Sequence, residues 1–143
     1  MELALQELEA ADRQLRSEFS PQLARRTAHW LSQLTGGRYS EVTLDRELHA
    51  MVSSREELIP RESTLLSQGT ADQVYLALRL ALCELVLPED SPIVLDDALL
   101  SFDDQRLGYA LEALLKFSEH RQVLLFTCQD RENRYIKNRG GAL

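Results

Sequence analysis

Two short groups of residues in this chain have the chemistry to bind phosphate and a metal ion. Leu66-Ser67-Gln68-Gly69-Thr70 is a Ser/Gly turn that opens a long apolar stretch, and the acidic pair Asp96-Asp97 ends an apolar run. The free N–H groups at a helix N-terminus attract anions, and a glycine leaves room for close approach. Carboxylate oxygens are the protein ligands that Mg²⁺ prefers. The two groups therefore predict a phosphate-sensing turn paired with a metal-binding carboxylate.

A helix must begin at this turn to supply the N–H groups. Thr70-Ala71-Asp72-Gln73 has the form of a capping box, which predicts Thr70 as the N-cap and Gln73 as its reciprocal partner. The helix that follows, from Ala71 to Leu87, is apolar nearly all round, and such a helix is expected to be central and buried.

The acidic pair is positioned by a predicted β-α-β unit. Residues 93–95 form a short apolar strand, residues 104–118 carry leucines at helical spacing, and residues 123–126 form a second apolar strand. Ligands of open α/β sheets bind beyond the carboxyl ends of the strands. Asp96, Asp97 and residues 127–130 all follow such ends, so we expect them to meet at one edge of the sheet.

The N-terminal third is predicted to be helical. Residues 1–19 place Leu8, Ala11, Leu15 and Phe19 on one stripe, and Ser20-Pro21 predicts a break and a restart. The second helix runs from Pro21 to about Leu34 and turns these residues inward: Leu23, Thr27, Trp30, Leu31 and Leu34. Two interpretations of this segment stay open, the end of a coiled-coil arm and an ordinary amphipathic hairpin or bent helix.

Between the two predicted regions lies a short β segment. Thr35-Gly36-Gly37 ends the helix, and residues 38–44 alternate as a strand with Tyr39, Val42 and Leu44 buried. A second strand at residues 48–52 could pair with it, and residues 53–65 are predicted to be a loop with a short strand or helix. The expected fold is α/β, with helices packed on a mostly parallel sheet and a small antiparallel addition.

Three motifs in this order carry a resemblance to a known family. The turn at residues 66–70 resembles the ABC-type signature motif LSGGQ, residues 93–97 resemble Walker B, and Ser101-Phe102-Asp103 resembles the D-loop. Over roughly residues 36 to 130 the chain is similar to the C-terminal half of the ATPase head of SbcC-, RecN- and SMC-like proteins. The resemblance implies a P-loop NTPase-like C-terminal lobe at residues 35–143, with residues 1–34 as the end of a coiled-coil arm.

The resemblance also implies cofactors and roles. ATP and Mg²⁺ are the expected cofactors, with Asp96 holding the metal and Asp97 at the position of the glutamate that polarises water. Gln129 occupies the position of the switch histidine. The nucleotide of a partner head would be contacted by the remaining site residues, Ser67, Gln68, Gly69, Thr70 and Asp103. Aspartate has about one methylene less reach than glutamate, and glutamine carries no proton at neutral pH, so slower turnover is expected.

One element of the family is missing from the sequence. No Gly-x-x-x-x-Gly-Lys-Ser/Thr occurs, and the only lysines are Lys116 and Lys137. We therefore expect an ATPase only when an N-terminal P-loop half, from the same or another chain, completes it, and no activity alone. A second head is the expected dimer partner, and the family adds DNA and a nuclease subunit. The alternative is a non-catalytic dimerisation or scaffold module with a degenerate head.

Composition narrows the class of protein. The chain has 143 residues and a net charge of −7, which argues against coating nucleic acid through overall basicity. Its two cysteines show no metal or disulfide spacing. Since no apolar stretch approaches the roughly 20 residues that span a bilayer, we expect no membrane partner and a cytoplasmic location.

Overall fold

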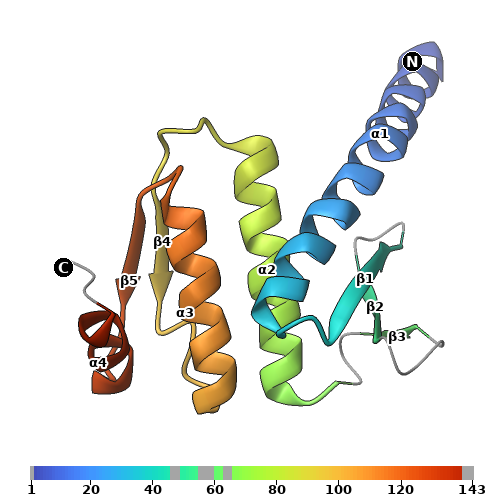
Figure 1. The fold of residues 1–143 in the computed structure, drawn as a ribbon. Helices are drawn as coiled ribbons and strands as arrows, with labels where there is room; N and C mark the ends of the chain where they lie inside the picture. Colours follow the sequence, from blue (N-terminus) through green and yellow to red (C-terminus); the bar gives the residue numbers. More distant parts are fainter. Residues whose placement is uncertain (1, 46–48, 55–59, 63–65, 140–143) are drawn as a thin grey trace.

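The computed structural model describes residues 2–45, 49–54, 60–62 and 66–139. A long N-terminal helix leads into a three-stranded antiparallel sheet, and a helical and parallel-stranded region follows (Figure 1). The predicted packing of Leu8, Ala11 and Leu15 lies outside the described side chains, and residue 48 of the predicted second strand lies outside the described residues.

Helix α1 runs without interruption over Glu2–Leu34, so the predicted break at Ser20-Pro21 is wrong. Proline removes one helical hydrogen bond, here to the carbonyl of Ser17. Both Pro21 and Ser17 are exposed, so water can satisfy that carbonyl and the helix continues. The first part of α1 projects away from the body of the molecule (Figure 1). The second part packs into the core, and the inward positions predicted for it are confirmed as buried, namely Leu23, Thr27, Trp30, Leu31 and Leu34.

The helix ends at the predicted glycine pair through a hydrogen-bonded C-terminal motif. Gly36 N–H donates to Gln33 C=O at 3.4 Å, and Gly37 N–H donates to Ser32 C=O at 2.7 Å. These are the two bonds of a Schellman motif, which requires a left-handed residue after the cap. Gly36 supplies it with a φ of 60°.

The antiparallel sheet contains β1 (Tyr39–Leu44), β2 (Ala50–Ser54) and β3 (Arg61–Glu62). Its order is β1-β2-β3, and Val42 of β1 pairs with Val52 of β2. Of the three positions predicted to be buried in the first strand, Val42 is buried, whereas Tyr39 and Leu44 are half-buried. The sheet lies beside the C-terminal half of α1.

The β-α-β unit is confirmed. Helix α2 (Gln68–Val86) leads to β4 (Ile93–Asp96), α3 (Asp104–Ser118), β5 (Val123–Phe126) and α4 (Asp130–Asn138). Strands β4 and β5 pair in parallel, with Ile93 opposite Val123. The expectation of a mostly parallel sheet needs correction, because the described strands form two separate sheets and the parallel one has two strands. Local strand patterns do not reveal which strands pair, and this accounts for the difference.

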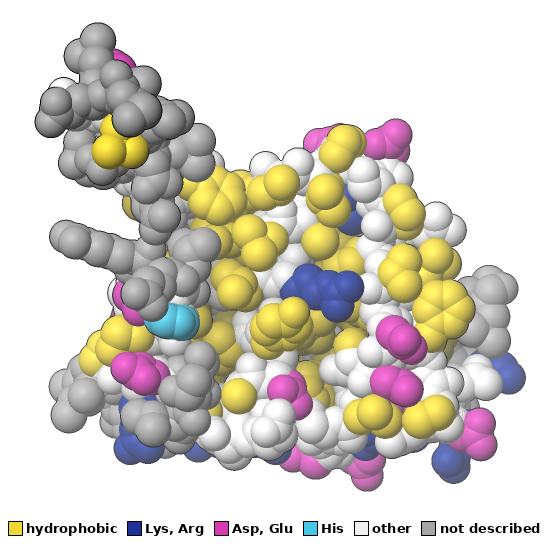
Figure 2. All heavy atoms as spheres, turned by 180° about the vertical axis from the view of Figure 1, so that it is seen from behind, with side chains coloured by type: hydrophobic (Ala, Val, Ile, Leu, Met, Phe, Trp, Pro, Cys, Tyr) yellow, Lys and Arg dark blue, Asp and Glu magenta, His cyan; other side chains and the backbone are white. Residues whose placement is uncertain are grey.

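The core joins the second half of α1, one side of α2, α3 and the inward faces of both sheets. Helix α2 is buried on one side by residues such as Val74, Ala77 and Leu80, but Tyr75 is 68% exposed and Val86 is 61% exposed. The prediction of a central, buried helix is therefore confirmed for one side of α2 and wrong for the other. The outward-facing strand residues Val94 and Phe126 are exposed as well. Figure 2 shows apolar side chains gathered over the side of the molecule turned away in Figure 1.

Among the described helices, none is both long and apolar enough to cross a bilayer.

Candidate functional site

The residues singled out from the sequence lie at one end of the molecule. Helices α2, α3 and α4 begin at the lower end of Figure 1, and β4 and β5 end there. The signature-like turn precedes α2, Asp96 and Asp97 end β4, Asp103 precedes α3 and Gln129 precedes α4. The amino ends of three helices and the carboxyl ends of two parallel strands thus face the same way, which makes this end favourable for an anion.

The turn before α2 is capped differently from the prediction. Ser67, not Thr70, is the N-cap, and its carbonyl accepts the N–H groups of Thr70 and Ala71 at 2.9 and 2.8 Å. The side chain of Gln73 does not return to the cap but donates to the carbonyl of Leu34. That carbonyl belongs to the last turn of α1 and lacks a helical donor, so it competes successfully for the buried amide of Gln73. The helix consequently starts one turn earlier, at Gln68.

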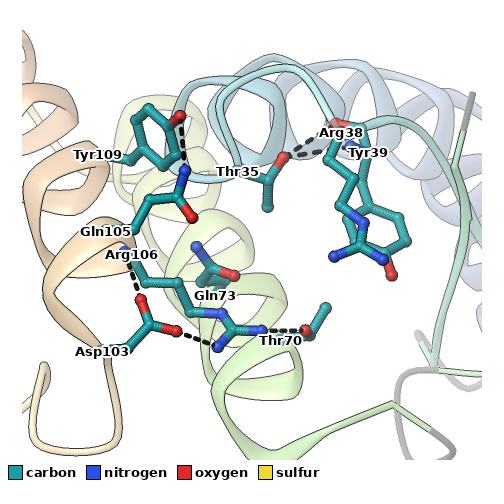
Figure 3. Close-up of a pocket in the computed structure, with 9 residues that line it drawn as sticks. All are labelled: Thr35, Arg38, Tyr39, Thr70, Gln73, Asp103, Gln105, Arg106 and Tyr109. Atoms are coloured by element: carbon teal, nitrogen blue, oxygen red, sulfur yellow. Dashed lines mark hydrogen bonds and ion pairs between the residues drawn. The ribbon is translucent and has the colours of Figure 1, made fainter.

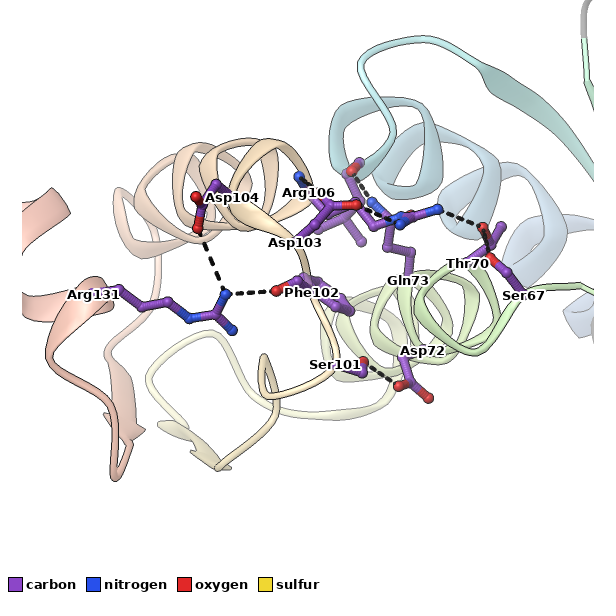
Figure 4. Close-up of polar contacts among 11 residues, drawn as sticks. Ser67, Thr70, Asp72, Gln73, Ser101, Phe102, Asp103, Asp104, Arg106 and Arg131 are labelled. Carbon is purple, nitrogen blue, oxygen red and sulfur yellow. Dashed lines mark hydrogen bonds and ion pairs between the residues drawn. The ribbon is translucent and has the colours of Figure 1, made fainter.

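The hydroxyl of Thr70 takes part in a different contact. Thr70 is 5% exposed, and its Oγ1 lies 2.9 Å from Ser67 Oγ and 3.3 Å from Nη2 of Arg106. Ser67 and Gln68 are exposed, whereas Gly69 is buried. The exposed Ser67 therefore contacts the buried Thr70, which in turn contacts the half-buried Arg106 (Figure 4).

Asp103 is the N-cap of α3 and binds Arg106 twice. Its Oδ1 accepts the backbone N–H of Arg106 at 2.8 Å, and its Oδ2 lies 2.6 Å from Arg106 Nη1. The backbone N–H of Arg106 is the largest cause, and the guanidinium a further one, of the lowered pKa of this carboxyl. Asp103 is therefore a stable anion at neutral pH, held next to a cation that also reaches Thr70.

A second contact joins the same two turns. The hydroxyl of Ser101 donates to the carboxylate of Asp72, one turn into α2 (Figure 4). A Cβ atom on Gly69 would lie 3.3 Å from Ser101 O and 3.4 Å from Nη1 of Arg106. The glycine expected to admit an anion thus also makes room for the neighbouring turn, and this close approach accounts for its burial.

The acidic pair has two different environments. Asp96 is exposed at the last position of β4. Asp97 has a left-handed backbone, with a φ of 46°, which aspartate tolerates better than most residues. Its N–H donates to Phe126 C=O at 2.9 Å and its Oδ1 accepts Cys128 N–H at 3.0 Å. The Asp96 carboxylate is thus exposed to solvent, whereas Asp97 connects the ends of β4 and β5 through hydrogen bonds.

The Asp97 carboxylate also affects the thiol beside it. Cys128 is exposed, and its hydrogen bond with Asp97 raises the thiol pKa, with partial desolvation as a smaller cause. The thiol is therefore protonated at neutral pH and can donate to the carboxylate. Gln129 follows as the N-cap of α4 and is half-buried, with no side-chain cap hydrogen bond.

A polar pocket of about 460 Å³ lies between the end of α1 and the starts of α2 and α3. Its lining includes Thr70, Asp103 and Arg106 together with Arg38 and Tyr109 (Figure 3). Arg38 and Arg106 bring two cations to this pocket, and Asp103 brings one anion. The described surface next to the signature-like turn is therefore polar and concave rather than flat.

The donor set fits Mg²⁺ bound together with phosphate. Mg²⁺ uses one or two protein carboxylates and fills its other positions with water and phosphate oxygens. Asp96 offers an exposed carboxylate for this purpose, and Asp97 follows it directly. Within the described residues no three His, Cys, Asp or Glu side chains are grouped to enclose a metal by themselves. The site therefore suits a metal that arrives with a nucleotide.

Sequence reasoning missed two arginines and one helix. Arg106 lies three residues after Asp103, a spacing that places both on one face of α3 and could have been noticed. Arg131 binds the carbonyls of Phe102 at 2.6 Å and Leu99 at 3.0 Å from the first turn of α4. Helix α4 has Asp130 in its first turn, as a helix dipole favours, but no helix was predicted after residue 126.

Comparison with known proteins identifies the fold. No protein-family model matches the chain. It is 32% identical over 112 residues to the uncharacterised protein YhaN of Bacillus subtilis, which covers 77% of this chain and 12% of YhaN. The chain thus spans about an eighth of the length of that relative.

The structural matches are to heads of SMC proteins. An SMC ATPase studied for ATP-driven dimerisation and DNA-stimulated activation superposes with a TM-score of 0.71 and 14% identity, over 87% of this chain and 77% of that one. The SMC head domain of Thermotoga maritima gives 0.66 and 21%, over 85% and 43%. The Smc head of Pyrococcus furiosus, bound to the C-terminal domain of ScpA, gives 0.67 and 13%, over 94% and 35%. This chain has the fold found in SMC-type ATPase heads.

Proposed function

We propose that this chain is the C-terminal, signature and Walker B half of an SMC-like ATP-binding head, and that its signature turn acts on ATP held by a partner head. The observation that carries the proposal is the direct attachment of the signature-like turn to the turn of Asp103, through Thr70 and Arg106, at the end where Asp96 closes β4. The turns of Ser67 and Asp103, which are separate in sequence, are thus in contact.

The site residues fall into two groups with different proposed roles. Ser67, Gln68, Gly69 and Thr70 present a hydroxyl and the positive end of α2 to the phosphates of the partner's nucleotide. Asp103 acts across the same interface. Toward the nucleotide of its own head, Asp96 would hold Mg²⁺, Asp97 would orient the attacking water and Gln129 would donate a hydrogen bond to phosphate. ATP with Mg²⁺ supplies the phosphoryl group, and this chain supplies position and charge.

Exposed apolar surface supports completion of the head by a P-loop half. Strand β5 pairs only with β4 within the described strands, and the outward faces of the pair expose Val94, Leu124 and Phe126. Exposed apolar patches next to polar rims mark interaction sites. A P-loop half, in the same or a separate chain, would cover this face, and the second head would meet the turn of Ser67. DNA and a nuclease subunit are further predicted partners of the whole protein.

A second candidate function is a dimerisation or scaffold module without turnover. The observation in its favour is the engagement of Asp97, whose Oδ1 accepts Cys128 N–H and is thereby partly occupied. Gln129 adds to this, since it cannot exchange a proton near neutral pH. Such a module would still bind ATP and dimerise but would hydrolyse ATP no faster after dimerisation.

The test uses this chain joined to its P-loop half. ATP hydrolysis should fall by about 100-fold or more in Ser67→Arg and in Asp96→Ala, because each removes a group that stabilises the transition state. Ser118→Arg and Asp90→Ala are the matched controls, since Ser118 is exposed at the last position of α3 and Asp90 is exposed in the turn between α2 and β4. Hydrolysis unchanged in both site variants would refute the site. ATP-dependent dimerisation without hydrolysis would select the scaffold candidate.

A further inference from the structure

We propose that Arg106 is a positioning residue that, acting through Thr70, makes the Ser67 hydroxyl a hydrogen-bond donor toward the phosphate bound by the partner head. The inference rests on the proposed function, adds Arg106, which the motifs do not include, and gives Thr70 a specific role behind Ser67. Arg106 belongs to α3 and Thr70 to α2, and 36 residues separate them along the chain.

The three side chains form a linear series of polar contacts. Arg106 Nη2 lies 3.3 Å from Thr70 Oγ1, and Thr70 Oγ1 lies 2.9 Å from Ser67 Oγ. Arg106 and the buried Thr70 line the polar pocket of Figure 3, and the series ends at the exposed Ser67. The positions of the hydroxyl protons therefore decide in which direction the Ser67 O–H points.

Arg106 determines the polarity of this series. A guanidinium has only donors and stays charged at all accessible pH values, so Thr70 Oγ1 must accept from it. Thr70 is almost fully buried, and its own O–H proton needs an acceptor. Among the described contacts of Thr70 Oγ1, the second partner is Ser67 Oγ, so the proton of Thr70 points there. Ser67 Oγ thus accepts from within, and its proton is left to point outward.

Two further features keep Arg106 in this place. Asp103 binds the backbone N–H and Nη1 of Arg106, which orients the fork of the guanidinium. Gly69 has no side chain, and a Cβ there would lie 3.4 Å from both Cδ and Nη1 of Arg106. The guanidinium is therefore held directly behind the turn, in contact with Thr70.

The experiment measures ATP-dependent association of the completed head, with a non-hydrolysable ATP analogue to hold the dimer. Ser67→Ala should weaken association by about tenfold or more per site, the size of one hydrogen bond to a charged group. Thr70→Val keeps the shape but lets the Ser67 hydroxyl sample three staggered positions, so we expect a loss of about threefold. Thr70→Ser retains the hydroxyl and should behave as the wild type.

Coupling between the variants separates positioning from packing. Because Thr70 acts through Ser67, Thr70→Val should add nothing in a Ser67→Ala background, and Arg106→Met should likewise lose its effect on association there. Thermal unfolding of each variant without nucleotide checks that the fold is retained. If Thr70→Val does not fold, Arg106→Met with Ser67→Ala gives the same comparison.

The outcomes of these association measurements test the positioning role and the proposed function separately. Full additivity of Thr70→Val and Ser67→Ala, or failure of Thr70→Ser to restore association, overturns the positioning role while the proposed function stands. No effect of Ser67→Ala or Ser67→Arg on association refutes the proposed function itself. Loss in Ser67→Ala, a smaller loss in Thr70→Val and no further loss in the double variant support the inference.

Discussion

Replacing Arg131 with methionine should detach the segment that connects the acidic pair to Asp103. The guanidinium binds the carbonyls of Phe102 at 2.6 Å and Leu99 at 3.0 Å, and its side chain is 24% exposed. Its Nε lies 3.5 Å from Glu132 Oε1, and Glu132 is 2% exposed with Oε2 unpaired among the described atoms. Methionine keeps the apolar stem and helix propensity but removes every donor.

The expected magnitude follows from these contacts. Two short hydrogen bonds from a charged donor contribute about 1.5 kcal/mol each at the lower end of their range. Arg131 is also the cation paired with buried Glu132, so its loss adds the cost of an uncompensated charge, and breaking a buried pair costs about 3–5 kcal/mol in total. The 3.9 Å contact with Asp104 adds nothing, because that carboxylate is 99% exposed. We expect a loss of about 3–5 kcal/mol in the free energy of unfolding, a large part of the stability of a small domain.

Urea unfolding followed by the fluorescence of Trp30 measures this loss, since Trp30 is the single tryptophan and is buried. Arg134→Met, an exposed arginine on the same helix, is the matched control and should change stability by less than about 0.5 kcal/mol. Adding Glu132→Gln to Arg131→Met should recover part of the loss, because the buried charge is then gone. A loss below about 1 kcal/mol, or no recovery in the double variant, would refute the reasoning.

Two smaller predictions concern the turns around the site. The pKa of Asp103 lies below its ordinary value of 3.8, mainly because of the backbone N–H of Arg106, so the Asp103 carboxylate stabilises the fold fully above pH 3.8 and loses this effect as the pH falls through the lower folded-state pKa. The difference in unfolding free energy between wild type and Asp103→Asn should therefore shrink in that acid range. A constant difference would contradict this. Gly36→Ala and Gly37→Ala each force a side chain into a left-handed backbone, at a cost of about 1–2 kcal/mol. A Cβ at Gly36 would also lie 2.5 Å from a ring carbon of Tyr109, whereas a Cβ at Gly37 would face open space. Urea unfolding should therefore show the larger loss of stability for Gly36→Ala, and equal losses would count against the contact.

Short-range patterns in the sequence were sufficient to predict most elements. Apolar periodicity placed β5 at residues 123–126 and α3 at residues 104–118, as observed. The glycine pair at residues 36 and 37 correctly ended α1. These features depend on backbone preferences and side-chain spacing within a few residues, so a single sequence contains them.

The sequence also determined where the chemically capable residues stand along the chain: a Ser/Gly turn before an apolar helix, acidic residues after a strand, and an aspartate that caps the next helix. Only the tertiary structure decided how they connect. Thr70 could have capped α2, and it contacts Arg106 instead because α3 begins beside it. Gln73 could have completed the cap, and it binds Leu34 C=O because α1 ends against α2. The partner of each side chain depends on which unpaired carbonyl or cation another element places within hydrogen-bond distance. A local sequence pattern contains no information about that distance.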